Sequence, residues 1–134
     1  MKKSQRGFTL IELIVVLVLL GLITAVAVPR YLDMTTKARE NSLKSNLSSI
    51  RGAINLAYSK SILDSAPADP SYPSTLSTSM FENDLVPDDV LTPTNDVKVV
   101  TGSISVGDFD DDGGWIYSSS TGEVRVDLPD KHTW

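Results

Sequence analysis

The sequence predicts an α+β protein in which a long N-terminal α-helix, membrane-spanning in its first half, packs by its second half on a small C-terminal antiparallel β-sheet. Residues 8–28 form an almost uncharged apolar run, and residues 30–63 continue with helical periodicity. Residues 97–128 contain short segments of alternating apolar and polar residues, which are typical of strands. The length of 134 residues suits one domain.

The apolar run of residues 8–28 is long enough to cross a membrane as a helix. At about 1.5 Å per residue it spans roughly 30 Å, the thickness of a bilayer's hydrocarbon core. Lys2, Lys3 and Arg6 precede it without an acidic residue, which predicts a cytoplasmic N-terminus and an exported remainder. The alternative is a removable secretory signal, for which residues 25–27 would supply the small side chains.

Glu12 is the one charged residue in this run. A carboxylate in a membrane helix costs about 3 kcal/mol, so Glu12 either reaches the cytoplasmic interface or has a cationic partner. No Lys or Arg occurs between Arg6 and Arg30. An amine at Phe8, freed by a cut after Gly7 and belonging to a neighbouring copy, would be a suitable cation.

Residues 7–12, GFTLIE, together with the basic residues before them, resemble the prepilin signal of type IV pilins and type II secretion pseudopilins. The resemblance implies that residues 1–7 are a leader, and that a prepilin peptidase cuts between Gly7 and Phe8 and methylates the Phe8 amine. Residues 8–29 would remain as the transmembrane and assembly helix. Glu12 would then neutralise the Phe8 amine of an adjacent subunit.

The same resemblance implies a structural subunit of a type IV pilus-like filament. The chain would cross the inner membrane once, with a periplasmic head, before it enters an extracytoplasmic filament. Its implied partners are copies of itself, the prepilin peptidase, inner-membrane assembly platform proteins and, before assembly, the lipid bilayer. The alternative within the family is a pseudopilin of a type II secretion system that drives protein export. Neither the disulfide of many pilins nor the Asp-Pro-Trp-Gly string of many major pseudopilins is present.

Gly21 and Pro29 weaken the helix within residues 8–29. Pro29 removes a backbone hydrogen bond and clashes with the preceding turn, which predicts a kink where the chain leaves the membrane. In many pilins the helix melts between such a Gly and Pro inside the filament. The resemblance therefore implies an extensible segment between Gly21 and Pro29.

Residues 30–63 predict the amphipathic helix of the head. One apolar stripe follows helical spacing and is expected to pack on the sheet: Leu43, Leu47, Ile50, Ile54 and Ala57. Lys37, Lys44 and Arg51 recur every seven residues beside it. This basic row is either a solvated flank of the helix or a surface that contacts acidic residues of neighbouring subunits.

Residues 64–134 are expected to complete the head with a Pro-rich loop and about three strands. The loop contains Pro67, Pro70, Pro73, Pro87 and Pro93, too many for a long periodic element. A short helical turn is expected near residues 79–84. The expected strands are residues 97–106, with Val100, Ile104 and Val106 on one face, residues 115–117 and residues 123–128.

Composition argues against several classes of function. The chain has no Cys and one His, His132, so thiol chemistry, Cys-based zinc sites and multi-His metal sites are excluded. A formal charge of −5 argues against nucleic acid as a partner. Because no nucleophile–base pair or phosphate-binding loop occurs in the sequence, we do not expect an enzyme or a resident cofactor.

Asp108, Asp110 and Asp112 alternate before Gly113, as at the start of a calcium-binding EF-hand loop. The Glu required at loop position twelve is absent, because Ser119 stands there, and the flanking segments read as strands. The motif is therefore either a solvated acidic turn or a calcium site of another kind, with these three Asp residues as ligands.

Overall fold

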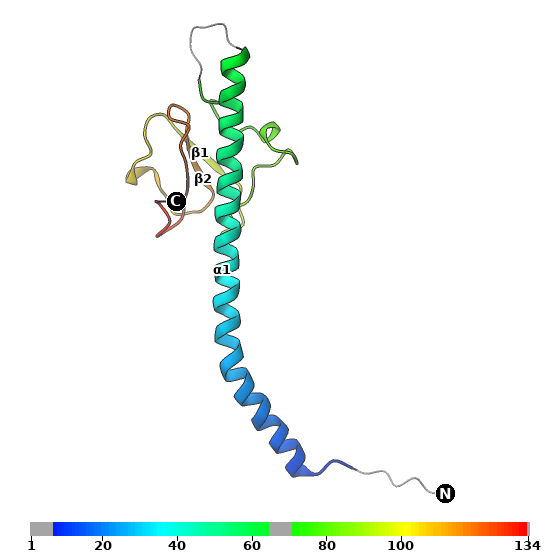
Figure 1. Cartoon of the computed structure of the whole chain (residues 1–134). Coiled ribbons are helices and arrows are strands. Elements are labelled where there is room, and N and C mark those ends of the chain that lie inside the picture. The colour runs from blue at the N-terminus through cyan, green and yellow to red at the C-terminus, as the bar shows by residue number, and fades with distance from the viewer. Residues whose placement is uncertain (1–6, 65–70, 134) are drawn as a thin grey trace, which may run out of the picture. The chain divides into compact units, whose positions relative to one another are not determined.

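The computed structural model describes residues 7–64 and 71–133. Its helix α1 runs from Leu10 to Asp64 (Figure 1) and contributes to two compact units, residues 1–38 and residues 39–134. The expected leader, apart from Gly7, lies outside the described residues, as do Pro67 and Pro70. The single long helix confirms the first part of the predicted fold class.

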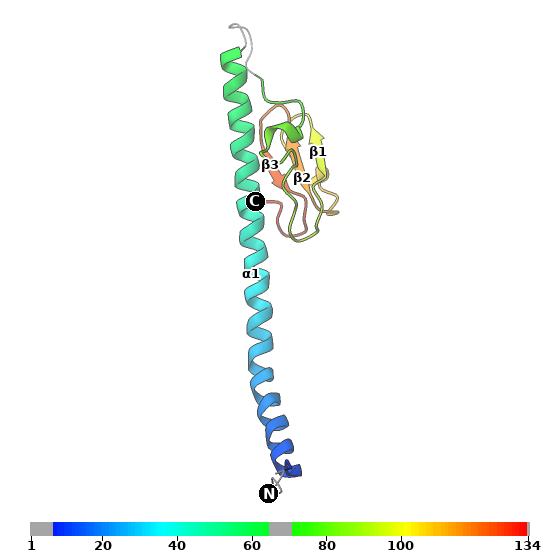
Figure 2. The same cartoon turned by 90° about the vertical axis from the view of Figure 1, so that its right-hand side faces the viewer.

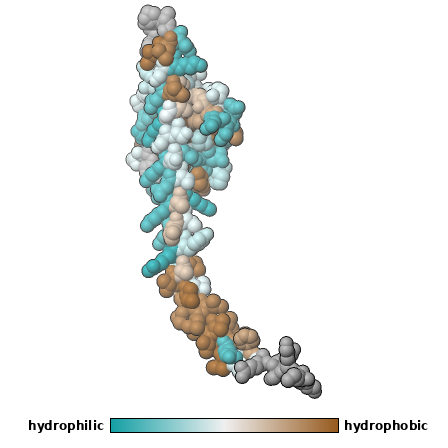
Figure 3. Space-filling view, turned by 45° about the vertical axis from the view of Figure 1, so that its right-hand side comes forward, coloured by the Kyte–Doolittle hydropathy of each residue, from teal (hydrophilic) through white to brown (hydrophobic). Residues whose placement is uncertain are grey.

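Of the described residues, the first unit contains the N-terminal part of α1 and the three residues before it. Apolar side chains cover this part of the helix, as the brown surface in Figure 3 shows, and large apolar residues remain exposed along residues 8–34. Within the described residues, α1 is the one helix that is long and apolar enough to cross a membrane.

The second unit contains a three-stranded sheet beside the C-terminal part of α1 (Figure 2). The strands are β1 (Val97–Val100), β2 (Trp115–Ser118) and β3 (Val124–Val126), in the order β1-β2-β3. Two short 3₁₀ helices, Thr78–Met80 and Val106–Asp108, lie in the connections. A long helix and a small sheet confirm the α+β class.

The direction of β1 differs from the expected antiparallel arrangement. β1 runs parallel to β2, with Val97 opposite Trp115, whereas β2 and β3 are antiparallel, with Trp115 opposite Val126. A parallel pair needs a crossover of about a dozen residues or more, and residues 101–114 provide one. This long return brings the chain back to the end of the sheet at which β1 begins.

The first expected strand is shorter than its pattern suggested. It ends at Val100, and the chain turns at Gly102, whose φ of 108° belongs to the region that favours glycine. Ile104 is buried as expected, but Val106 lies in a 3₁₀ helix and is 83 % exposed. The prediction that Val106 shares the buried face is therefore wrong.

The apolar stripe of α1 forms the core of the head as expected. Leu43, Leu47, Ile50 and Ile54 are buried, and Ala57 is half-buried. The four Leu and Ile residues belong to one cluster with the inward-facing residues of the sheet, among them Trp115, Tyr117, Val124 and Val126. The sheet therefore covers the stripe that the helical periodicity identified.

Two polar atoms of this core bind the Pro-rich loop. The indole N–H of Trp115 donates to the carbonyl of Pro87 at 2.8 Å, and the hydroxyl of Tyr117 donates to the carbonyl of Pro73 at 2.7 Å. Burial raises the pKa of Tyr117 to about 12. Both bonds hold a loop that has little regular structure against the sheet.

Candidate functional site

The N-terminal part of α1 exposes its apolar residues to a degree that an isolated soluble helix does not tolerate. Leu10, its first residue, is 75 % exposed, and Phe8, just before the helix, is 92 % exposed. The same condition extends along the helix to Ile11, Leu13, Ile14, Val15, Val16, Leu17, Val18, Leu19, Leu20, Leu22, Ile23, Val26 and Val28. Such a surface requires cover from lipid or from other protein chains.

Thr9 and Glu12 start the helix with a reciprocal capping box. The Oε2 atom of Glu12 accepts hydrogen bonds from the Thr9 backbone N–H at 2.8 Å and from its hydroxyl at 2.9 Å. In return, the backbone N–H of Glu12 donates to Oγ1 of Thr9 at 3.3 Å. The Thr-x-x-Glu spacing is a sequence signature of this motif, so the cap is a local feature of residues 9–12.

The capping box fixes Glu12 on the first turn, where the positive end of the helix dipole favours a carboxylate. Phe8, Ile11, Val15 and Val16 border the same shallow hollow as Glu12, so the carboxylate lies among apolar side chains. Among the described residues no cation pairs with Glu12. A positive group that arrived at this end of the helix would meet an accessible negative charge whose position is fixed by the capping box.

The bond between Gly7 and Phe8 lies outside the helix. Both residues are exposed, have no regular secondary structure, and precede Thr9, the N-cap. A Cβ atom built on Gly7 would have nothing within 4 Å. The backbone at this bond is therefore open to a second protein, which is the condition that proteolysis requires.

Gly21 and Pro29 both lie within the continuous helix α1. A Cβ atom added to Gly21 would meet open space. The hydroxyl of Thr24 donates to the carbonyl of Leu20 at 2.7 Å, beside Gly21. The helix thus tolerates both residues in the single chain, and its kinking and melting stay predictions.

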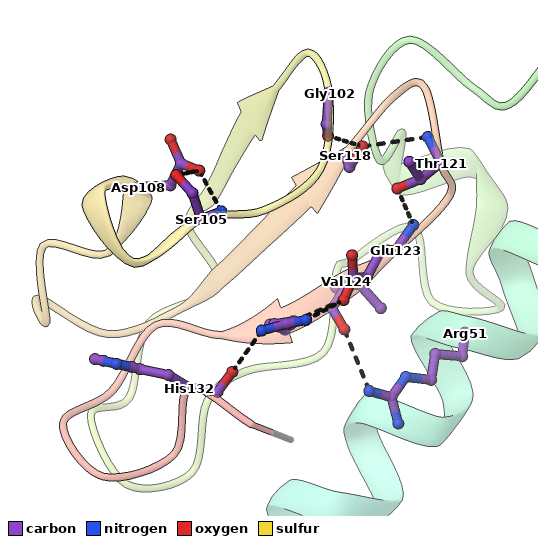
Figure 4. A network of polar contacts seen from close by, with 10 residues as sticks. Arg51, Gly102, Ser105, Asp108, Ser118, Thr121, Glu123, Val124 and His132 are labelled. Carbon is purple, nitrogen blue, oxygen red and sulfur yellow. Dashed lines mark hydrogen bonds and ion pairs between the residues drawn. The ribbon is translucent and has the colours of Figure 1, made fainter.

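Two residues of the basic row of α1, Arg51 and Lys37, have different surroundings. The guanidinium of Arg51 donates to the carbonyl of Val124 at 3.3 Å, a contact within the head that Figure 4 shows. Lys37 is exposed on the first unit. One member of the row therefore ties α1 to β3, which spacing in the sequence did not indicate.

The three Asp residues of the calcium hypothesis have different partners. The carboxylate of Asp108 accepts bonds from the Ser105 backbone N–H at 2.7 Å and hydroxyl at 2.8 Å (Figure 4), and these bonds lower the pKa of Asp108. Lys98 pairs with Asp110 at 3.1 Å and lowers its pKa. Asp112 is exposed. The described residues contain no group of three or more His, Cys, Asp or Glu side chains placed to hold a metal ion.

The buried carboxylate of Asp127 binds the backbone of this acidic loop. Asp127 occupies a polar position in the alternating pattern of residues 123–128, and such a position predicts an outward side chain. It is 2 % exposed and accepts hydrogen bonds from the backbone N–H groups of Asp110 at 3.2 Å and Asp111 at 3.0 Å. Burial raises the pKa of Asp127. Nothing in its sequence spacing signals this role, because the bonds come from residues far away in the chain.

Asp89 has a similar role in the Pro-rich loop. It is fully buried, and its carboxylate accepts bonds from the Leu91 backbone N–H at 2.9 Å and the Thr92 hydroxyl at 2.6 Å. An Asp that binds the backbone two residues ahead forms an Asx-turn, a local pattern that could have been read from the sequence.

Lys131 and His132, close to the C-terminal end, both contact other parts of the head. Lys131 pairs with Glu40 of α1 at 2.7 Å and lowers the pKa of Glu40. His132 lies 2.7 Å from Oδ1 of Asp111 and stacks on Phe109, with ring centroids 4.0 Å apart. The head is therefore closed at its C-terminal end by contacts to both α1 and the acidic loop.

Comparison with known proteins agrees with the N-terminal motif. Residues 2–28 match the family described as the prokaryotic N-terminal methylation motif. A fimbrial protein of Pseudomonas aeruginosa is 38 % identical over 73 residues, which are 52 % of this chain and 47 % of the relative. The type IV narrow pilus major component of Thermus thermophilus is 40 % identical over 52 residues, which are 39 % of this chain and 45 % of the relative.

A type IV major fimbrial protein of Dichelobacter nodosus is 35 % identical over 69 residues, which are 52 % of this chain and 41 % of the relative. The chain therefore spans about half the length of the curated relatives that it matches. No solved structure matches the chain.

Proposed function

Because the chain carries the N-terminal methylation motif of prepilins and is similar to type IV pilins over about half its length, we propose that it is a structural subunit of a type IV pilus-like filament. Its role is mechanical and not catalytic. The single observation that carries this proposal is the uncovered apolar surface of residues 8–28 with Glu12 held on its first turn.

The subunit starts as a prepilin in the inner membrane, with its N-terminus in the cytoplasm and its head in the periplasm. A prepilin peptidase removes residues 1–7 at the open bond between Gly7 and Phe8 and methylates the new amine. The cut creates a cation four residues before Glu12, and methylation leaves that amine able to hold its proton. In this way processing produces the positive group that the sequence lacks between Arg6 and Arg30.

Assembly transfers the apolar helix from lipid to a filament of identical helices, with the help of inner-membrane platform proteins. Glu12 pairs with the Phe8 amine of an adjacent copy, which removes the cost of about 3 kcal/mol for an unpaired carboxylate in an apolar medium. A misregistered subunit would leave both charges unpaired, so the pair selects the register of the helices as well as stabilising them.

A pseudopilin of a type II secretion system remains the alternative, because residues 7–12 serve both kinds of filament. The matched relatives are described as fimbrial proteins and pilus components, and this favours the pilus. A secretion defect without loss of surface filaments, on deletion of the chain from its own host, would favour the pseudopilin.

The test combines mass spectrometry with two matched substitutions in a host that has a complete assembly machinery and no major pilin of its own. The mature chain is expected to begin at Phe8 and to carry one methyl group on that residue's amine. Glu12→Gln retains an oxygen that accepts from Thr9, so it removes the charge and leaves the cap. It is expected to lower the amount of sheared filament at least tenfold, roughly a loss of 1.4 kcal/mol or more.

Asp33→Asn is the control, since Asp33 is an exposed carboxylate on the same helix. It is expected to leave filament yield within about twofold, a change of less than roughly 0.5 kcal/mol. Filaments of normal yield from the Glu12→Gln chain, or a chain that retains residues 1–7 in a competent host, would contradict the proposal.

A further inference from the structure

Charge is divided unevenly between the helix and the rest of the head. Residues 30–60 contain six Lys and Arg and two Asp and Glu, whereas residues 71–133 contain three Lys and Arg and twelve Asp and Glu. Two copies that meet head to head would repel each other, and two copies that meet helix to head would attract each other. The charge pattern therefore favours a contact in which the two partners use different surfaces.

The segment 81–88 forms the acidic side of such a contact. It exposes Glu82, Asp84 and Asp88, and Leu85 among them is 61 % exposed. Leu85, Glu82 and Asp88 border one hollow, whose wall is completed by Phe81, Asn83, Val86, Pro87, Asn46 and Ser49. An apolar side chain at a hollow with a charged rim has the organisation of a protein interface.

This segment is held in place from behind. Val86 is buried, the carbonyl of Pro87 accepts from the Trp115 indole at 2.8 Å, and the carbonyl of Asp88 accepts from the Asn46 side chain at 2.9 Å. A turn at Asp84 is closed by a backbone bond to Phe81 at 3.1 Å. A segment fixed in this way loses little conformational entropy when it binds a partner.

The basic side lies on the first unit. Arg30, Met34 and Lys37 are spaced by four and three residues, so they occupy one face of α1. Met34 is 70 % exposed, and both cations beside it are exposed. No ion pair joins either cation to Asp33, the acidic residue between them, within the described residues. The face thus presents a flexible apolar side chain between two positive charges.

We propose that the hollow beside Leu85 receives Met34 of a second copy of this chain, with Arg30 and Lys37 of that copy paired with Glu82 and Asp88. Met is unbranched and flexible, and it fills irregular hollows well. The inference rests on the proposed filament. It names one contact by which the head of one subunit binds residues 30–37 of another. In this contact Arg30 and Lys37 of one copy form ion pairs with acidic residues of another copy.

The first test uses the absence of Cys from the sequence. Two tagged forms of the full chain, Leu85→Cys and Met34→Cys, are expressed together in the host described above, so any disulfide between the two tags joins different copies. The control replaces Met34→Cys by Leu32→Cys, because Leu32 is 58 % exposed and faces the opposite side of the helix. The Leu85–Met34 pair is expected to give at least tenfold more mixed dimer than the control pair.

The second test reverses charges around the proposed contact and leaves Leu85 and Met34 unchanged. Lys37→Glu is expected to lower filament yield at least fivefold, and the further changes Glu82→Lys and Asp88→Lys in the same chain are expected to restore it. Lys60→Glu is the matched control, because Lys60 is another exposed cation of α1.

Equal cross-linking by the two cysteine pairs in a chain that forms filaments would overturn this inference and leave the proposed function intact. An equal effect of Lys37→Glu and Lys60→Glu would also overturn it, as would failure of the restoring changes. Absence of filaments from the unmodified chain in a competent host would overturn the proposed function, and this inference with it.

Discussion

Helix α1 carries apolar side chains in both units, but among the described residues only its stripe in the head is buried in a core. Leu47 is 2 % exposed against the sheet, whereas Leu17, of the same residue type in the first unit, is 60 % exposed. The head spaces its apolar residues as one stripe, while residues 8–28 are apolar nearly all round. The difference shows that α1 contributes to the folded core of the head at one end only, and it leaves the apolar surface of the other end available for the proposed assembly.

Leu→Ala substitutions test this difference most directly. Leu47→Ala is expected to lower the free energy of unfolding by about 2–5 kcal/mol, because it leaves a cavity in the core. Leu17→Ala and Leu56→Ala, the second in the exposed face of the head helix, are expected to change it by less than about 0.5 kcal/mol. Denaturant unfolding of the full chain in detergent, followed by Trp fluorescence, measures all three.

If Leu17→Ala destabilises the head as much as Leu47→Ala, the two parts of α1 do not have separate roles. The effect of Leu17→Ala on assembly is measured as the yield of filaments. We expect Leu17→Ala to affect assembly without affecting head stability, since its side chain is 60 % exposed and would pack on other copies in the proposed filament.

Gly122 lies in the turn between β2 and β3, where a side chain would be both strained and crowded. Its φ is 71°, and a Cβ atom would lie 2.2 Å from the ring of Tyr72, which stacks on Tyr58. Gly122→Ala is expected to lower the free energy of unfolding by about 1–3 kcal/mol through backbone strain and displacement of this ring. Gly107→Ala is the control, because Gly107 has no such conformation and open space around it.

Equal denaturation midpoints for these two variants would mean that the turn adapts without cost. Tyr58 lies on α1 and Tyr72 on the Pro-rich loop. A loss of stability in Gly122→Ala alone would therefore show that the turn after β2 helps to hold the Pro-rich loop against α1.

The parts of the fold that sequence predicted are those that depend on local spacing. The length of residues 8–28, the stripe from Leu43 to Ile54 and the motif at residues 7–12 each follow from neighbours within a few turns. The direction of β1 depends instead on where a long crossover returns, and alternation along a strand carries no information about that. The alternating pattern therefore predicted where the strands lie in the sequence, but it could not predict that β1 and β2 are parallel.

The candidate site shows the same limit. Glu12 stood out because a charge in an apolar run is anomalous in any fold. The burial of Asp127 could not be predicted in this way, because it depends on contacts with the backbone of Asp110 and Asp111. These two residues lie in the crossover between β1 and β2, far from Asp127 in the sequence. A period of two assigns side chains to the faces of a strand, but it cannot show that a loop covers the outer face.

Acid titration compares two kinds of carboxyl group in the head. The pKa of Glu40 is lowered by Lys131, so its contribution to stability is present above its ordinary pKa and is lost as the pH falls through the lowered value. The pKa of Asp127 is raised by burial, so the folded state holds this proton more tightly than the unfolded chain. The contribution of Asp127 therefore favours folding increasingly as the pH falls.

The two matched amide variants are thus expected to change the pH dependence in opposite directions. Between about pH 6 and pH 3, which brackets the ordinary carboxyl pKa values, Glu40→Gln is expected to lose less stability than the unmodified chain. Asp127→Asn is expected to lose more. Denaturant unfolding at several pH values measures both, and slopes that change in the same direction would refute the assignment of the two groups.

Calcium addition is expected to have the smallest effect on the head. Asp108 is held by Ser105, and Asp110 is paired with Lys98, so binding by these carboxylates would first have to break existing contacts. A ligand at about one hundred times its Kd stabilises a protein by about 2.7 kcal/mol, which raises Tm by several degrees. We expect no rise of this size at millimolar calcium. A rise that Asp112→Asn abolishes, and that magnesium does not reproduce, would instead establish the calcium site and show that the loop rearranges around the ion.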